Sequence, residues 1–283
     1  MNAQTVSDEL RRWILAQAEA GGRPQELLAA MVRSGWDEEL AAEALVQELT
    51  ARLAQLQHRQ QREALPPAAA VPEPASGTAL QAGGRVVQVL ASMTLSRAVL
   101  FGGLLDDDEC RALVALARPR LERSQTVDGA TGGNEVNAAR TSEGMFFERG
   151  ETPLLAAIEE RIAELVRWPV ERGEGIQVLR YRPGAEYRPH HDYFDPAHPG
   201  TARILARGGQ RVATIVIYLE APAAGGATTF PEVGLEVAPV RGHALFFSYA
   251  RAHPAGKTLH GGAAVTAGEK WVATKWLRER AFV

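Results

Sequence analysis

In residues 4–57, apolar side chains recur every three or four positions, a spacing that predicts amphipathic helices. Ser7 and Asp37 stand where two of these helices would begin, because their side chains can accept hydrogen bonds from the first backbone N–H groups. Gly21 and Gly22 would end the first helix. The pattern therefore predicts three short helices joined by tight turns, a small all-α module over residues 1–57.

Residues 58–84 break this pattern. Pro, Ala, Gly and Gln dominate the segment, and its centre has no periodic apolar face. Such a composition favours extended, polyproline-like chain. We therefore expect a linker here, which separates the helical module from a second domain.

Residues 85–283 combine helix-like and strand-like patterns of apolar residues. Two amphipathic helices are predicted within residues 105–124 and 151–168, the first with acidic residues in its opening turn and the second with Pro153 in its first turn. Short strand signals separated by Gly- and Pro-rich turns accompany them: IQVLRY, RVATIVIYLE, LEVAPV, HALFFSY and WVATKWL. The fold class predicted for this domain is α+β, with helices packed on a β-sandwich or jelly roll.

Composition narrows the function classes. The 283 residues are 46% hydrophobic and 23% charged, which is ordinary for a globular protein, and the formal net charge of −3 offers no basic excess for binding nucleic acid. No run is long enough to span a membrane, and the first residues lack the apolar core of a signal peptide. The single cysteine, Cys110, excludes an internal disulfide. We expect a cytoplasmic protein without nucleic-acid or membrane partners.

A cluster of metal-ligating residues lies in the stretch YRPHHDYFDP, although the whole chain has only seven histidines. On an extended chain, side chains alternate between the two faces, so His190 and Asp192 would point the same way and His191 the opposite way. Such an H-x-D pair presents one imidazole and one carboxylate to a common point. A metal ion there would satisfy both groups.

The third ligand must come from elsewhere in the chain, and the candidates are His198, His243, His253 and His260. Two histidines and one carboxylate on one face of an octahedral ion are typical of non-haem Fe(II) oxygenases. A zinc site with a bound water is the alternative. Lys270, ten residues after His260, is a cation that could bind the far end of a dicarboxylate co-substrate.

The segment from about residue 100 to 277 resembles the catalytic domain of the prolyl 4-hydroxylase family of 2-oxoglutarate- and Fe(II)-dependent dioxygenases. The matching motifs occur in order: RTSEGMFF, EGIQVLRYRPGAEYRPHHDYFDP, GGQRVATIVIYLE, GGATTFP, HALFFSY and LHGGAAVTAGEKWVATKW. The resemblance implies a double-stranded β-helix (jelly-roll) catalytic domain with flanking helices. It does not extend to the N-terminal helices.

The resemblance also implies roles for individual residues. His190, Asp192 and His260 correspond to the iron ligands, and Lys270 to the residue that pairs with the distal carboxylate of 2-oxoglutarate. Tyr181 and Thr228 match positions that line the co-substrate pocket. In family members that act on peptides, six further positions contact the substrate, and they correspond here to Arg140, Ser142, Glu174, Tyr187, Arg211 and Trp276. As an alternative, a structural ion-pair set could be formed by Arg140, Ser142, Glu174 and Arg211.

The function implied is hydroxylation of prolyl residues in a peptide or protein, with Fe(II), 2-oxoglutarate, O2 and ascorbate as reductant, and with release of succinate and CO2. Alternatives are a hydroxylase of a free amino acid or small metabolite, and a non-catalytic metal-binding sensor domain. Residues 1–57, with a Ser-Gly-Trp turn, resemble small three-helix modules of the ubiquitin-associated type. That resemblance implies a protein partner for the N-terminal helices.

Overall fold

The chain forms two compact units, Met1–Leu65 and Pro66–Val283. The structure, a computed structural model, describes residues 6–19, 21–63, 65–66, 68–123, 126–127, 134–135 and 141–283. Among these residues, no helix combines the length and the apolar character needed to cross a bilayer.

The first unit consists of the three predicted helices, α1 (Asp8–Glu19), α2 (Pro24–Arg33) and α3 (Glu38–Glu63). The two expected caps are present, since the Ser7 hydroxyl accepts from Leu10 N–H at 3.2 Å and the Asp37 carboxylate accepts from Leu40 N–H at 3.2 Å. A small core of its own, built around Ile14, holds the three helices together.

Helix α3 continues to Glu63, beyond the end of the module that we expected at residue 57. Five of the six extra residues are Arg, Gln or Glu, which favour helix, and the first proline after them is Pro66. The segment predicted as linker, residues 58–84, is therefore helix at its start.

The end of that segment belongs to the second unit. The backbone N–H of Ala69 donates to the carbonyl of Ala250 at 2.7 Å, and strand β1 (Ala79–Ala82) pairs with β2 (Arg85–Met93). Leu80 and Ala82 alternate with exposed residues and are buried. The second unit thus begins before residue 85, because a short alternating strand follows the proline-rich stretch.

Two antiparallel sheets face each other in the second unit, as the α+β, double-stranded β-helix prediction requires. The major sheet has nine strands in the order β1-β2-β3-β14-β10-β17-β8-β7-β4, and the minor sheet has four in the order β13-β12-β15-β9. Their remaining bounds are β3 (Ala98–Gly102), β4 (Glu122–Arg123), β7 (Glu143–Phe146), β8 (Gln177–Tyr181), β9 (Tyr187–His190), β10 (Arg211–Glu220), β12 (Thr228–Phe230), β13 (Leu235–Val237), β14 (Ala244–Ser248), β15 (His260–Gly262) and β17 (Lys270–Arg278).

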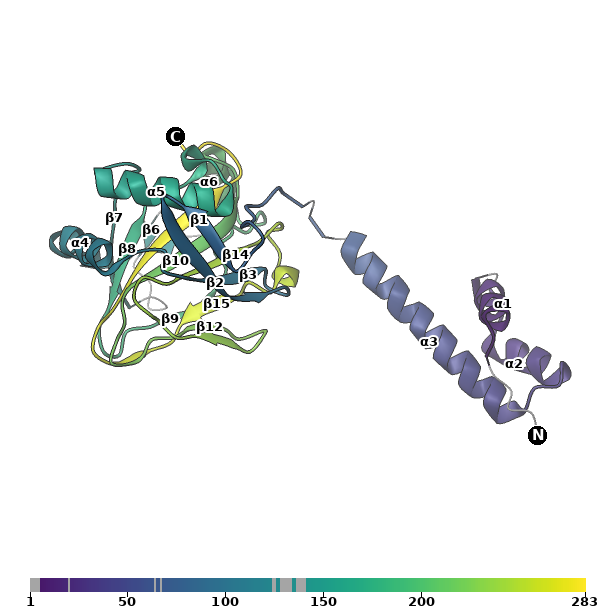
Figure 1. Ribbon diagram of the computed structural model, residues 1–283. Coiled ribbons are helices and arrows are strands. Elements are labelled where there is room, and N and C mark those ends of the chain that lie inside the picture. Colours follow the sequence, from purple (N-terminus) through teal and green to yellow (C-terminus); the bar gives the residue numbers. More distant parts are fainter. Residues whose placement is uncertain are drawn as a thin grey trace. The chain divides into compact units, whose positions relative to one another are not determined.

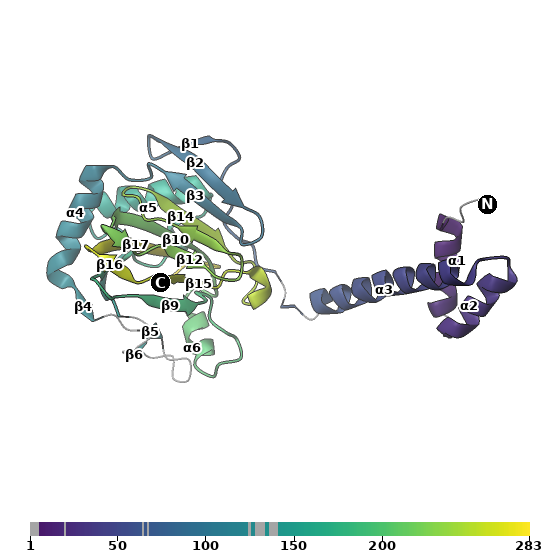
Figure 2. The same ribbon diagram turned by 90° about the horizontal axis from the view of Figure 1, so that it is seen from below.

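Helices α4 (Asp107–Ala117) and α5 (Pro153–Val166) cover the outer face of the major sheet, and the minor sheet lies on its other side (Figures 1 and 2). Shorter elements connect them: α6 (Thr201–Ala206), β5 (Thr126–Val127) paired with β6 (Asn134–Glu135), β11 (Ala224–Gly225) paired with β16 (Val265–Ala267), and the 3-10 turns Arg118–Arg120, Val170–Arg172 and Pro254–Gly256.

Strand β17 shows how the two faces of the major sheet are used. Trp271 and Leu277 point into the core beneath the helices, whereas Lys270, Thr274 and Trp276 alternate with them and line a cavity between the sheets. All nine residues of the strand are buried. The period of two therefore places a row of polar and aromatic side chains inside the sandwich.

On its helix-facing side, β17 also carries a buried ion pair. Lys275 and Glu159 of α5 are 2% and 1% exposed and bond to each other, and the Glu159 carboxylate also accepts from Gly150 N–H at 2.8 Å. Each of these buried charges is stabilised by the opposite charge of its partner, because water cannot reach it to solvate it.

We expect Glu159→Gln to destabilise the protein by about 3 to 5 kcal/mol, because it leaves the Lys275 ammonium buried without a counter-charge. Chemical denaturation followed by circular dichroism would measure this loss. Glu160→Gln, a change of the exposed neighbouring carboxylate, is the matched control and should alter the stability little. Equal stabilities of the two variants would contradict this interpretation of the pair.

Candidate metal centre and co-substrate cavity

Antiparallel pairing of β9 with β15 places His190 directly opposite His260, although 70 positions separate them in the sequence. The centroids of the two imidazole rings lie 4.5 Å apart. Asp192 follows β9, and its two carboxylate oxygens each lie 3.5 Å from an Nε2 atom, Oδ1 from that of His190 and Oδ2 from that of His260. Ligand atoms of the three residues all lie within 4.8 Å of one another.

The two imidazoles are oriented by the backbone. Nδ1–H of His190 donates to the carbonyl of Arg188 at 2.9 Å, and Nδ1–H of His260 donates to the carbonyl of Thr258 at 3.0 Å. These bonds place the proton on Nδ1, so the lone pair of each Nε2 faces the shared point beside Asp192. This donor set, two imidazoles and one carboxylate, fits a divalent iron ion.

The strands can approach this closely because Gly261 follows His260. A Cβ atom at position 261 would lie 2.8 Å from the carbonyl oxygen of Tyr187 and 3.1 Å from the backbone nitrogen of Pro189. Any side chain at this position would push β15 away from β9. The His-Gly sequence is thus a requirement of the register that brings the two imidazoles together.

Charge and burial favour the ligand-ready state of the three side chains. Burial opposes ionisation of Asp192, but the facing imidazoles of His260 and His190 outweigh it and hold the pKa of the carboxyl below its usual value. Burial lowers the pKa of His260 to about 4, with Asp192 partly opposing the shift. His260 is therefore neutral at physiological pH, as a metal ligand must be.

A cavity between the two sheets contains the three residues. Both polar and apolar side chains line it: Leu179, Tyr181, Tyr187, His190, Asp192, Thr214, Val216, Thr228, His260, Gly261, Gly262, Lys270, Val272, Thr274 and Trp276. Three predicted co-substrate residues, Tyr181, Thr228 and Lys270, are among them. The structure thus brings the predicted iron and co-substrate positions into one cavity.

Lys270 is the cation of this cavity. Its side chain is 4% exposed, and Nζ lies 5.5 Å from the ring centroid of Tyr181 and 5.8 Å from that of Tyr218. Burial lowers the pKa of its ammonium to about 8. A buried ammonium between two aromatic rings is suited to bind a carboxylate that enters from the solvent.

Five of the six predicted substrate residues lie in the part of the chain that the structure describes. Trp276, Tyr187 and Arg211 lie beside the metal position, with Tyr187 stacked on His190 at 3.7 Å between ring centroids. Ser142 is fully buried. Arg140 lies outside the described residues.

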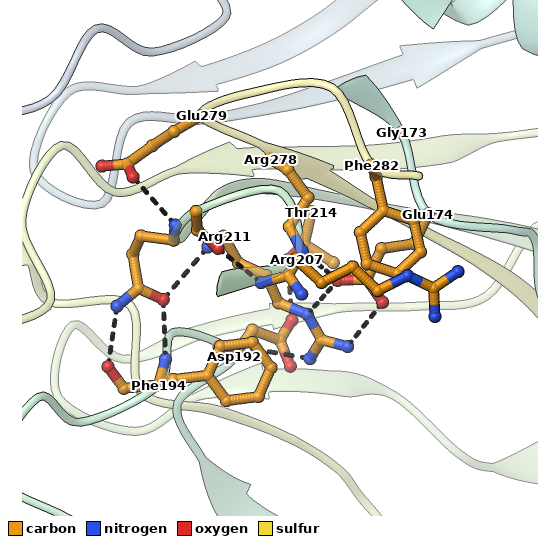
Figure 3. Close-up of polar contacts among 12 residues, drawn as sticks. Gly173, Glu174, Asp192, Phe194, Arg207, Arg211, Thr214, Arg278, Glu279 and Phe282 are labelled. Carbon is orange, nitrogen blue, oxygen red and sulfur yellow. Dashed lines mark hydrogen bonds and ion pairs between the residues drawn. The ribbon is translucent and has the colours of Figure 1, made fainter. Parts of the chain in front are cut away.

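Glu174 and Arg211 form a two-bonded ion pair, with Nε–Oε1 and Nη2–Oε2 distances of 2.7 and 2.9 Å (Figure 3). The Arg211 guanidinium lies 3.9 Å from the ring centroid of Trp276, and Arg278 Nε lies 3.0 Å from the same Glu174 carboxylate. The structure therefore contains an ion pair between Glu174 and Arg211, as the alternative interpretation of these residues expects. It also fixes Arg211 at the edge of the cavity, which a substrate-contacting residue requires.

The remaining histidines lie apart from the metal position. His191 stacks on Tyr193 at 4.7 Å between ring centroids, as expected for a side chain on the opposite face, and His253 accepts from the backbone N–H of Ala255. Among the described residues, only the set of His190, Asp192 and His260 gathers three metal-ligating side chains.

Two buried hydroxyl residues of β10, which the sequence analysis did not select, join the site. Thr214 Oγ1 donates to Asp192 Oδ2 at 2.7 Å, and Tyr218 Oη donates to Thr228 Oγ1 at 2.9 Å. The available signal was a threonine and a tyrosine within the otherwise apolar strand RVATIVIYLE, because buried hydroxyls need partners.

Comparison with known proteins agrees with this geometry. Residues 176–278 match the 2OG-Fe(II) oxygenase superfamily. Prolyl 4-hydroxylase 1 of Arabidopsis thaliana is 43% identical over 204 residues, which cover 65% of this chain and 70% of that protein. Probable prolyl 4-hydroxylase 10 of the same plant is 39% identical over 205 residues, covering 64% and 68%.

Among solved structures, the viral collagen prolyl hydroxylase of Paramecium Bursaria Chlorella virus-1, as its 2OG complex, superposes with a TM-score of 0.50. It is 29% identical, and the match covers 64% of this chain and 95% of the viral one. Fold and site together define a 2-oxoglutarate- and Fe(II)-dependent oxygenase. Within that class, the chain belongs to the prolyl 4-hydroxylase family.

The lowered pKa of Lys270 predicts how 2-oxoglutarate binding depends on pH. The ammonium is charged below pH 8 and loses its proton above it, and only the charged form attracts a carboxylate. The dissociation constant should therefore be lowest below pH 8 and rise by up to about tenfold per pH unit above it. Calorimetry on the Mn(II)-loaded protein would measure it.

Lys270→Met supplies the control for this measurement. It should bind 2-oxoglutarate weakly at every pH and lack the change near pH 8. A dissociation constant of the unmodified protein that stays flat from pH 7 to 9.5 would contradict the role of Lys270.

Proposed function

We propose that this oxygenase hydroxylates prolyl residues in a peptide or protein, with release of succinate and CO2. The observation that carries the proposal is the convergence of His190, Asp192 and His260, with both Nε2 atoms facing one point, in a cavity that also contains Lys270. The relatives named prolyl 4-hydroxylase support the prolyl substrate.

In this proposal, His190, Asp192 and His260 hold Fe(II), and Lys270, Tyr181 and Thr228 hold 2-oxoglutarate. Bound Fe(II), with 2-oxoglutarate and O2, supplies the oxidising chemistry that inserts one oxygen atom into a C–H bond. The hydroxyl of Thr228 is oriented by Tyr218, and the Lys270 ammonium provides the counter-charge for the distal carboxylate.

The apolar wall formed by Leu179, Val216 and Val272 limits the access of water to the metal position. Exclusion of water from this surface would direct the oxidation at the bound substrate instead of at solvent. Burial of the metal position between the two sheets thus contributes to the proposed chemistry.

Trp276 and Arg211 are the described residues best placed to meet a peptide. Trp276 lines the cavity and is only 7% exposed. Its indole N–H is buried and has no hydrogen-bond partner among the described residues. A peptide carbonyl would satisfy this donor. Arg211 is held against the Trp276 ring by Glu174, so its guanidinium is already in place when a substrate arrives.

A free amino acid or small metabolite remains the alternative substrate, and a non-catalytic sensor is the alternative class. Proposed additions are ascorbate as the reductant and a cytoplasmic location, the latter supported by the single cysteine. The helices of the Met1–Leu65 unit are proposed to bind a protein partner, for example the target of hydroxylation.

The substrate class is tested with purified protein, Fe(II), ascorbate and labelled 2-oxoglutarate. We expect proline-rich peptides to raise succinate release and to gain the mass of one oxygen atom on proline, with little effect from free proline. Stimulation by free amino acids alone would favour the small-substrate alternative, and bound iron without turnover would favour the sensor.

The metal assignment is tested in the same assay with a pair of neighbouring histidines. His190→Ala should abolish turnover and iron binding while the fold persists, because it removes one of three ligands. His191→Ala is the matched control, since its ring packs on Tyr193 away from the metal position, and it should retain both. Normal turnover in His190→Ala would show that the ligand assignment is wrong.

A further inference from the structure

We propose that Thr214 and Tyr249 are positioning residues that fix the rotation of the Asp192 carboxylate for metal binding. This inference rests on the proposed metal site and concerns how the protein prepares it. Neither residue belongs to the ligand set or to the predicted co-substrate and substrate residues. Both are buried beside Asp192, with exposures of 0% for Thr214 and 3% for Tyr249.

The two hydroxyls form a directed chain to the carboxylate. Thr214 Oγ1 lies 2.7 Å from Asp192 Oδ2 (Figure 3), and 3.0 Å from the Tyr249 hydroxyl on its other side. A metal-binding carboxylate only accepts hydrogen bonds, so Thr214 must donate its one proton to Asp192. Thr214 can then only accept from Tyr249. The order of donation is therefore Tyr249 to Thr214 to Asp192.

The backbone holds both ends of this chain in place. Thr214 lies in the middle of β10, paired with Trp276 of β17 on one side and with Phe247 of β14 on the other. Tyr249 follows β14, and its N–H donates to the carbonyl of Val212 at 2.9 Å. Two adjacent central strands thus present the hydroxyls rigidly, whereas Asp192 follows the end of strand β9.

Fixing Oδ2 has a consequence for the metal. Oδ1 and Oδ2 each lie 3.5 Å from one imidazole Nε2, so a freely rotating carboxylate could offer either oxygen, or both, to an ion between them. A hydrogen bond from Thr214 occupies Oδ2 and favours binding through Oδ1 alone. One oxygen from Asp192 leaves three of six positions open for co-substrate and O2.

The inference is tested with Co(II), an air-stable probe that reports its ligands through its visible absorption, added to the purified full chain without 2-oxoglutarate. Thr214→Val removes only the hydroxyl. We expect it to raise the Co(II) dissociation constant by about 10- to 100-fold and to change the absorption spectrum at saturation. Tyr249→Phe should change both in the same direction but less, and Thr214→Ser should restore the values of the unmodified protein.

Thr229→Val is the matched control, because Thr229 lies on β12 next to the cavity residue Thr228 and does not line the cavity. It should bind Co(II) as the unmodified protein does. An unchanged affinity and spectrum in Thr214→Val would overturn the inference. If Thr214→Val does not fold, an unchanged spectrum in Tyr249→Phe would overturn it equally. Failure of the unmodified protein to bind Co(II) would instead contradict the proposed metal site itself.

Discussion

The pairing of β9 with β15 is the constraint on which the site depends. It sets His190 across from His260 and brings the Asp192 carboxylate within 3.5 Å of both imidazoles. A slip of one residue in this register would turn one imidazole to the opposite face of the minor sheet. Gly261, where a side chain would collide with the backbone of β9, helps to exclude such a slip.

Burial then gives the site its electrostatic character. His260 and Asp192 are 5% and 7% exposed, and in this environment the pKa of the imidazole and the pKa of the carboxyl are both lowered, so that at physiological pH the imidazole of His260 is neutral and the carboxylate is ionised. Lys270 on β17 adds a buried ammonium to the same cavity. Separate strands of one sandwich thus supply the proposed metal ligands and the proposed counter-charge, and the properties of both depend on the fold.

The sequence predicted the parts of this account that are local. Alternation along an extended chain was enough to pair His190 with Asp192, and capping and periodicity located the helices of the first unit. The choice of His260 over the other histidines came from the family resemblance, because the pairing of β9 with β15 cannot be deduced from spacing. The Thr214–Asp192 bond was missed for the same physical reason, since it joins segments 22 positions apart through tertiary packing.

Two predicted boundaries were wrong, the end of the helical module and the start of the second domain, because the local sequence patterns there are weak. The end of α3 extends to Glu63 because its last residues favour helix without forming an apolar stripe that would have marked them. Strand β1 was hidden in a proline-rich context, and only its pairing with β2 shows that it belongs to the catalytic unit. In both cases the composition suggested a linker, and neighbouring structure decided otherwise.

The most direct test of the central claim is a crystal structure of the protein grown with Fe(II) and 2-oxoglutarate without oxygen, with anomalous data at the iron edge. We predict one anomalous peak bound by the Nε2 atoms of His190 and His260 and by Asp192, with the distal carboxylate of 2-oxoglutarate on the Lys270 ammonium. A peak elsewhere, or imidazoles turned away from each other around an empty site, would contradict the account.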